Sequence, residues 1–172
     1  MGRILGIDPG SRVTGYGVID AAAKGPLLVA YGCIRTETES FPARLKQIYD
    51  GIYNVALQYG PDELAIEQVF MHKNADSALK LGHARGAAIC GALAAGVAVY
   101  EYAARAVKQA LVGKGSADKH QVQHMVKVLL SLSAPLQSDA SDALGVALCH
   151  MHNQQTVRRI EELTRRPGAA RV

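Results

Sequence analysis

Apolar and polar positions in the first third of the chain follow the pattern of β-strands. Apolar runs fill residues 4–8, 13–20 and 27–35, with short polar or glycine-containing breaks between them. Breaks this short favour three neighbouring antiparallel strands. Two later runs, at residues 63–68 and 97–100, predict two further strands. The pattern therefore indicates a sheet of about five strands.

Apolar residues at helical spacing appear after the third of these strands. Helices are predicted over residues 42–60, 74–95, a shorter segment through 111, 117–132 and 139–152. The first begins with Pro42 and ends at Gly60, which are common residues at these two positions. Three strands followed by alternating helices and strands predict an α/β fold, a mixed sheet with helices on both faces.

Length and composition narrow the class of protein. A chain of 172 residues, 49% of them hydrophobic, has the size of one globular domain with a sizeable core. We expect this domain over residues 1–157, followed by a basic, disordered tail over residues 158–172. No segment has the features of a signal peptide or of a membrane span. We therefore expect a soluble, cytoplasmic protein that binds no membrane.

Cysteines and histidines do not predict a zinc site. Cys33, Cys90 and Cys149 are far apart and lack Cys-x-x-Cys spacing, so we expect reduced thiols without disulfides. His120 and His124 have the i, i+4 spacing of a zinc pair, but no glutamate stands between them to act as a base. Neither is expected to be a metal ligand.

Four acidic residues stand where strands end or where a helix begins. Asp8 and Glu67 each follow an apolar strand, and Asp8 precedes a Pro-Gly turn. Asp139 and Asp142 have i, i+3 spacing at the start of an otherwise apolar helix, so they share one face. Each has an ordinary structural alternative. Asp8 would then cap its turn, and the pair would complement the helix dipole.

Taken together, the four acids favour bound metal. Carboxylates that enter one buried site repel one another unless a cation neutralises them. Ligands that are all oxygen favour Mg²⁺, with Mn²⁺ as a substitute, over zinc. The sequence therefore predicts a site for divalent metal.

Basic residues concentrate in a different part of the chain. Between Glu67 and Asp139 there are eight basic residues against three acidic ones, in a chain whose net charge is +4. An acidic metal pocket beside a basic surface suits the cutting of a polyanion, because metals act on the scissile phosphate and lysines bind its neighbours. A plain solvated face is the alternative.

Three stretches resemble the RuvC family of Holliday junction resolvases. They are Gly6-Ile-Asp8-Pro-Gly-Ser-Arg-Val-Thr-Gly-Tyr-Gly17, Ile66-Glu67-Gln-Val-Phe70 with Asn74-Ala-Asp-Ser-Ala-Leu-Lys-Leu-Gly82, and Asp139-Ala-Ser-Asp142-Ala-Leu. The resemblance implies a ribonuclease H-like fold, a homodimer and Mg²⁺, with two ions expected per active site. It also implies symmetric nicking of four-way DNA junctions, alongside the RuvA and RuvB proteins, in recombination and repair.

The resemblance also implies roles for single residues. The catalytic, metal-holding carboxylates would be Asp8, Glu67, Asp139 and Asp142. Lys108 and Lys119 would lie near the cut phosphate, and Phe70 would disturb base pairing at the crossover. The alternative for Phe70 is a core residue that anchors its loop. Lys73, Arg85 and Lys114 are expected DNA contacts because they belong to the basic stretch between Glu67 and Asp139.

Two other functions are compatible with parts of the sequence: a nucleotide-binding phosphotransferase and a junction-binding module without nuclease activity. Gly-Ile-Asp-x-Gly also opens the actin-like and sugar-kinase folds, but those proteins need two such domains, and no second phosphate-binding turn is found. A junction-binding module without nuclease activity would require a lost carboxylate, and all four are present.

Small residues in the helix 74–95 make it the expected dimer contact, with packing inside one subunit as the alternative.

Overall fold

The computed structural model describes residues 2–69 and 74–165, and five strands in these ranges form one mixed sheet. The strands are β1 (Arg3–Asp8), β2 (Val13–Ala22), β3 (Gly25–Arg35), β4 (Glu63–Glu67) and β5 (Ala98–Tyr102). Their order is β3-β2-β1-β4-β5. β1, β2 and β3 pair antiparallel, whereas β4 is parallel to β1 and β5 is parallel to β4. The predicted mixed sheet is confirmed.

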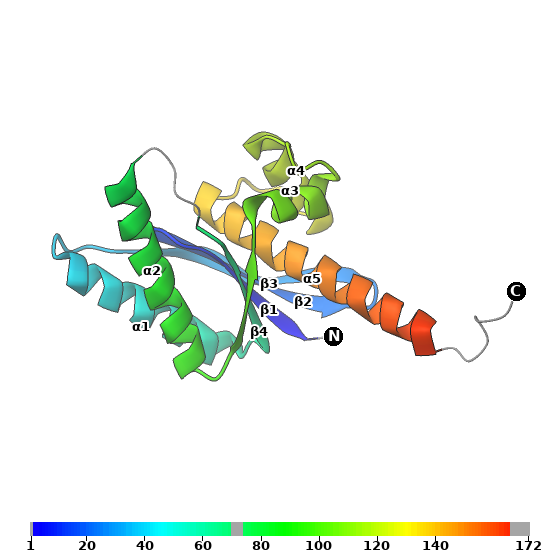
Figure 1. Cartoon of the computed structure of the whole chain (residues 1–172), viewed down its shortest axis with the longest axis horizontal. Helices are drawn as coiled ribbons and strands as arrows, with labels where there is room; N and C mark the ends of the chain where they lie inside the picture. Colours follow the sequence, from blue (N-terminus) through cyan, green and yellow to red (C-terminus); the bar gives the residue numbers. More distant parts are fainter. Residues whose placement is uncertain (1, 70–73, 166–172) are drawn as a thin grey trace, which may run out of the picture.

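Helices cover both faces of this sheet, as predicted. In the described ranges they are α1 (Phe41–Tyr59), α2 (Ala75–Ala94), α3 (Ala104–Val112), α4 (Lys119–Leu129) and α5 (Ser138–Arg165). α1 and α2 pack together on one face, and α5 lies across the other face with α3 and α4 beside it (Figure 1). Among the described residues, no helix is long and apolar enough to cross a membrane.

Side-chain caps fix where two of the helices begin. Asn74 caps α2, because its side chain accepts a hydrogen bond from the amide of Ser77 at 3.2 Å. Asp118 caps α4 in a capping box with Gln121, in which each side chain bonds the other's backbone amide. This cap places Lys119 at the first position of α4.

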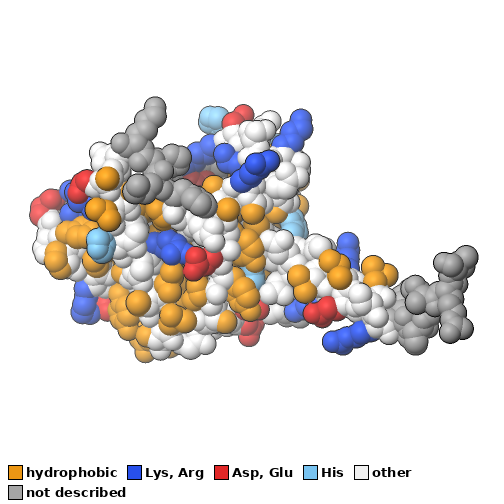
Figure 2. All heavy atoms as spheres, in the orientation of Figure 1, with side chains coloured by type: hydrophobic (Ala, Val, Ile, Leu, Met, Phe, Trp, Pro, Cys, Tyr) orange, Lys and Arg blue, Asp and Glu red, His pale blue; other side chains and the backbone are white. Residues whose placement is uncertain are grey.

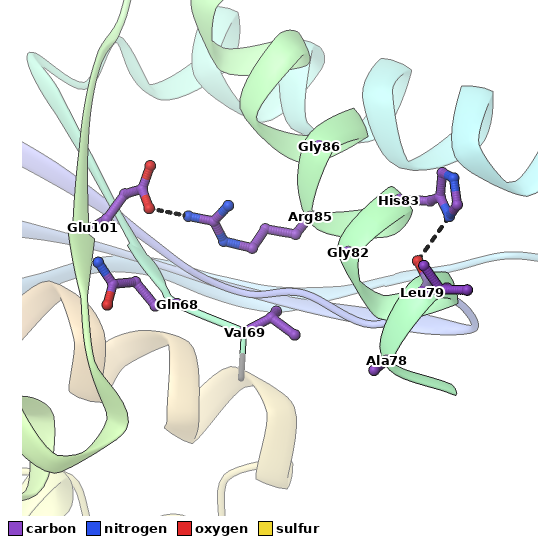
Figure 3. Close-up of a pocket in the computed structure, with 9 residues that line it drawn as sticks. All are labelled: Gln68, Val69, Ala78, Leu79, Gly82, His83, Arg85, Gly86 and Glu101. Carbon is purple, nitrogen blue, oxygen red and sulfur yellow. Dashed lines mark hydrogen bonds and ion pairs between the residues drawn. The ribbon is translucent and has the colours of Figure 1, made fainter. Parts of the chain in front are cut away.

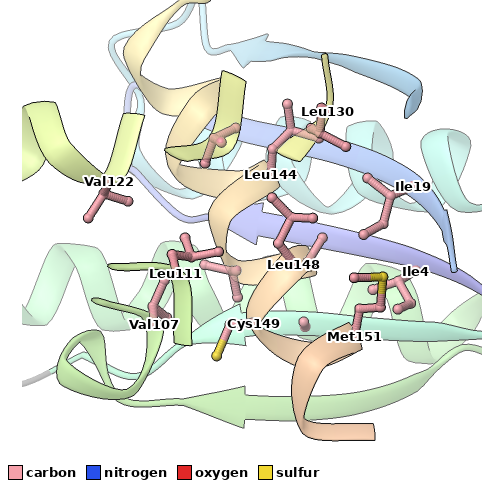
Figure 4. Packing of buried hydrophobic residues seen from close by; sticks show 14 of the residues in the cluster. Ile4, Ile19, Val107, Leu111, Val122, Leu130, Leu144, Leu148, Cys149 and Met151 are labelled. Carbon is pink, nitrogen blue, oxygen red and sulfur yellow. The ribbon is translucent and has the colours of Figure 1, made fainter. Parts of the chain in front are cut away.

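Two hydrophobic cores lie on the two faces of the sheet. Under α1 and α2, the sheet residues Leu5, Ile7 and Ile66 are fully buried. On the other face, α5 is buried from Ala140 to Met151 apart from a single partly exposed residue, and side chains of α3, α4 and the sheet surround it (Figure 4). Each fully buried leucine or isoleucine stabilises the fold by about 1.5–3 kcal/mol, so α5 is held firmly on the sheet.

Glycines in β1 and β2 allow α5 to lie close to the sheet. A Cβ atom at Gly6 would overlap the carbonyl oxygen of Ala143, and one at Gly15 would overlap that of Asp139. At Gly17 it would overlap the side chain of α5 above it. The neighbour of the two β2 glycines is therefore α5, through its backbone at Gly15 and through the side chain of Leu144 at Gly17.

α5 is longer than predicted. It continues to Arg165 instead of ending near residue 152. Residues 158–165 are helical and exposed, which corrects the expected disorder in this part of the tail. Glu161 and Arg165 have the favourable i, i+4 order, and residues 153–166 contain no proline or glycine. The domain boundary after residue 157 stays a prediction.

A buried polar network ties α5 to the edge of the sheet. His150 is fully buried, with Nε2 2.8 Å from a carboxylate oxygen of Glu63 and Nδ1 2.6 Å from the hydroxyl of Tyr102. An ionised carboxylate only accepts, so Nε2 donates to Glu63 and Nδ1 accepts from Tyr102. Burial raises the pKa of Tyr102 to about 12, which keeps its hydroxyl a donor. His150 therefore has a structural role here.

The cysteines are free thiols, as expected. Cys149 lies in the core under α5, and burial raises the pKa of its thiol to about 11. Such a thiol is poorly reactive, because the thiolate is the nucleophilic form.

Candidate functional site

Asp8 ends β1 at a turn that a buried threonine holds. The hydroxyl of Thr14 donates to the carbonyl of Gly10 at 2.9 Å and accepts from the amide of Gly10 at 3.3 Å. Asp8 stands opposite Gly15 in the register of β1 and β2. Because Gly15 lies against the backbone of Asp139 in the first turn of α5, the carboxylate of Asp8 is carried to the start of that helix.

β4 and α5 bring the other three predicted acids to the same edge of the sheet. β4 pairs parallel with β1, with Ile66 opposite Ile7, so Glu67 leaves the sheet beside Asp8. Asp139 and Asp142 lie at the start of α5. The charge of Asp8 interacts with those of all three other acids. The structure therefore brings the four carboxylates together, with Asp8 at the centre.

The charges of these carboxylates oppose one another. Burial, and then the charges of Asp142, Glu67 and Asp139, raise the pKa of Asp8 to about 7. The pKa of Glu67 is also raised, first by burial and then by Asp142. Raised pKa values show that the ionised forms are disfavoured in this pocket. A cation bound among the acids would remove that penalty.

A cavity of about 270 Å³ opens beside the acids. Lys108 and Lys119, the two lysines predicted near the cut phosphate, line it with Glu67 and Asp142. The Nζ atom of Lys119 lies 2.7 Å from Oδ2 of Asp142. The hydrogen bond that Lys119 donates to this carboxylate raises the pKa of Lys119. The charge of Lys108 acts on Glu67 and opposes the rise in its pKa. The cavity is thus lined by both carboxylates and lysine ammonium groups.

The four acids lie at the same edge of the sheet, but their side chains are not arranged as the ligands of one metal ion. Within residues 2–69 and 74–165, no three His, Cys, Asp or Glu side chains are placed to hold a metal ion together. Lys119 occupies one carboxylate oxygen of Asp142, so a metal would displace its ammonium group or use the other oxygen. The donor set still fits a hard divalent cation, because all four donors are carboxylates and Asp8 gains from neutralisation.

Of the four other residues predicted to contact DNA, the two that the structure describes do not line the cavity beside the acids. Phe70 and Lys73 lie outside the described residues. Lys114 is exposed in the turn between α3 and α4, apart from the residues that line the cavity. Arg85 points from α2 to the end of β4, where its Nε donates to the carbonyl oxygen of Glu67 at 2.9 Å. DNA binding by these residues stays a prediction.

Cys33 lies near the acids, which the sequence reasoning missed. It stands opposite Gly15 in the register of β2 and β3, so it shares a row of the sheet with Asp8. Burial and the charge of Asp139 raise the pKa of its thiol, and the amide of Ala140 donates to it. Only the register of the three antiparallel strands reveals this neighbour, and spacing along the sequence does not determine register.

Comparisons with known proteins point to one family. The family model described as crossover junction endodeoxyribonuclease RuvC matches residues 4–150. The protein of that name from Methylococcus capsulatus is 65% identical over 166 residues, which are 96% of this chain and 100% of that protein. The one from Tolumonas auensis is 64% identical over 157 residues, 91% of each chain. The structure of Thermus thermophilus RuvC in complex with a Holliday junction substrate matches with a TM-score of 0.85 at 34% identity, covering 91% of this chain and 97% of that one.

Proposed function

This chain belongs to the RuvC family of crossover junction endodeoxyribonucleases, and we propose that it resolves Holliday junctions by metal-dependent hydrolysis at the four carboxylates. The observation that carries the proposal is the convergence of four acids at one edge of the sheet, where burial and the three neighbouring charges raise the pKa of Asp8 to about 7. An arrangement so costly to the ionised acids is characteristic of functional sites. The two lysines at the same cavity suit a phosphate substrate.

We assign the metal ligands to Asp8, Glu67, Asp139 and Asp142, with Mg²⁺ as the ion and Mn²⁺ as its substitute. Two divalent ions, when bound, supply an activated water and stabilise the departing 3′ oxygen, which leaves a 5′-phosphate end. Asp8 would be the central ligand, because its charge interacts with those of all three other acids. Lys119 would leave Asp142 and bind a phosphate beside the cut.

Replacing Lys108 or Lys119 by alanine should weaken binding or cleavage of a junction. If each ammonium group neutralises one phosphate, the slope of log affinity against log salt should fall by about one. The measurements are junction binding at several salt concentrations in Ca²⁺ and single-turnover cleavage in Mg²⁺. Lys46→Ala is the matched control, because Lys46 is exposed on α1 and pairs with Asp50. An unchanged slope with unchanged cleavage in both site variants would assign these lysines to the solvated surface.

Paired cuts in a two-fold symmetric junction call for two active sites, and therefore for a homodimer. We propose the face formed by α2 and β5 as the interface. Hydrophobic side chains gather on this face, where Leu79, Leu93 and Tyr100 are exposed (Figure 2). A Cβ atom at Gly82 or Gly86 of α2 would have no described atom of the same subunit within 4 Å, apart from the neighbouring backbone of α2 itself. Packing inside one subunit therefore does not explain these two glycines.

The parent protein should sediment at about twice its chain mass of 18.3 kDa at micromolar concentration. Leu79→Lys should shift the protein toward one chain mass, because it places a charge in the proposed interface. Leu57→Lys is the control, since Leu57 is similarly exposed on α1. Mixed dimers of parent and Asp8→Asn subunits should nick one strand without resolving the junction. A monomer that makes paired cuts would contradict the proposed dimer.

We further propose that the protein acts in the cytoplasm with the RuvA and RuvB branch-migration proteins. The direct test of its function uses a mobile four-way junction labelled on each strand, a duplex of the same sequence and an assay for ATP hydrolysis. We expect nicks in two strands of like polarity in Mg²⁺, none in EDTA and no ATP turnover. ATP turnover without nicking would favour a phosphotransferase, and binding without nicking a junction-binding module.

A further inference from the structure

Arg85 reaches the end of β4 from α2, on the face of the sheet opposite α5. Its Nε donates to the carbonyl oxygen of Glu67 at 2.9 Å, and its Nη2 lies 2.5 Å from a carboxylate oxygen of Glu101 on β5 (Figure 3). The Arg85 side chain is only 18% exposed. The guanidinium group is therefore held between α2 and two strands and does not project into solvent.

The peptide that Arg85 holds is the one that orients Glu67. Glu67 is the last residue of β4, and the next amide, that of Gln68, still donates to the carbonyl of Tyr102 at 2.8 Å. Arg85 satisfies the carbonyl of Glu67 at the point where the strand stops. Holding this carbonyl limits rotation of the backbone at Glu67, and the direction of its carboxylate follows from that backbone.

Among the described residues of one subunit, little packing supports this end of β4 from the α2 side, which is part of the face proposed above as the dimer interface. A cavity of about 760 Å³ opens there, and Gln68 and Val69 line it together with Arg85 and Glu101 (Figure 3). Chain that borders so much open space lacks the tight packing that holds a core strand. The guanidinium group, which Glu101 holds from the neighbouring strand, supports this peptide from the α2 side, in addition to the hydrogen bond between Gln68 and Tyr102.

We propose that Arg85 is a positioning residue, which aims the carboxylate of Glu67 at the metal site by holding the Glu67 carbonyl. It is then not a DNA contact. The inference rests on the proposed function, because it needs Glu67 to be a metal ligand. Removing a group that supports a metal ligand typically costs about 10–100-fold in metal affinity or activity.

The test compares Arg85→Ala, Arg85→Lys and Glu101→Gln with the parent. Lys80→Ala is the matched control, because Lys80 is on the same helix and pairs with Asp76 of that helix. Four quantities are measured: Mn²⁺ affinity of the protein without DNA, single-turnover cleavage at saturating junction, junction affinity in Ca²⁺ at several salt concentrations, and Tm.

Arg85→Ala should lower both Mn²⁺ affinity and the cleavage rate by about 10–100-fold, with junction affinity and salt slope unchanged. Arg85→Lys should show most of the same loss of Mn²⁺ affinity and cleavage rate. An ammonium group lacks the planar guanidinium fork that reaches both the carbonyl of Glu67 and the carboxylate of Glu101. Glu101→Gln should show a smaller defect, and Lys80→Ala none.

Two outcomes would overturn the inference. Weaker junction binding with a smaller salt slope and normal Mn²⁺ affinity would make Arg85 a DNA contact. A lower Tm with normal Mn²⁺ affinity and a normal cleavage rate would leave it a purely structural role. Failure of the proposed function looks different, because the parent itself would then cleave no junction, while the comparison of Mn²⁺ affinities would still decide the role of Arg85.

Discussion

Asp8→Asn should abolish junction cleavage in Mg²⁺ while junction binding is kept or becomes tighter. An amide is a weaker ligand than a carboxylate for a hard cation, and the change removes a negative charge that faces phosphate. If the lost metal stabilisation of the transition state is about 4 kcal/mol, the rate falls about a thousandfold. The measurements are single-turnover cleavage in Mg²⁺ and junction affinity in Ca²⁺.

The control for this variant is Asp50→Asn, which makes the same chemical change at an acid on α1 that pairs only with Lys46 among the described contacts. It should cleave like the parent. If Asp8→Asn also cleaved at near the parent rate, the assignment of the metal site to this cluster would be wrong.

Without divalent metal, Asp8→Asn should be more stable than the parent at pH 8. The pKa of Asp8 is about 7 in the folded protein against an ordinary 3.8, so the folded state binds more protons between these values. Stability from the protonated carboxyl is fully present below 3.8 and is lost as pH rises through 7. The loss amounts to at most about 4 kcal/mol, from 1.36 kcal/mol per pKa unit. An asparagine at this position is neutral at every pH, so the variant does not lose this stability as the pH rises.

Urea unfolding of the parent and the variant in EDTA at several pH values between 4 and 8 measures this effect. The stability advantage of Asp8→Asn should be largest at pH 8 and should shrink as pH falls. Adding Mg²⁺ at pH 8 should stabilise the parent far more than the variant, because bound metal neutralises the acids. An advantage that is the same at every pH would contradict the raised pKa of Asp8.

Local features of the sequence determined most of the elements and the identity of the four acids. Apolar periodicity placed the strands and helices, and the helix predicted over residues 74–95 begins after Asn74, which caps α2. Asp8 and Glu67 were recognised because each ends an apolar strand. These features depend on neighbours a few residues away, so the chain order alone contains them.

Only the tertiary structure decided which side chains meet. Lys119 pairs with Asp142, and Arg85 reaches Glu67, across contacts between separate elements. Cys33 joins the row of Asp8 only through the register of three strands. Neighbouring residues in the sequence do not determine these pairings. They depend on how the helices pack on a twisted sheet and on how closely the glycines of the sheet allow α5 to approach. The periodicity of one element does not contain that information.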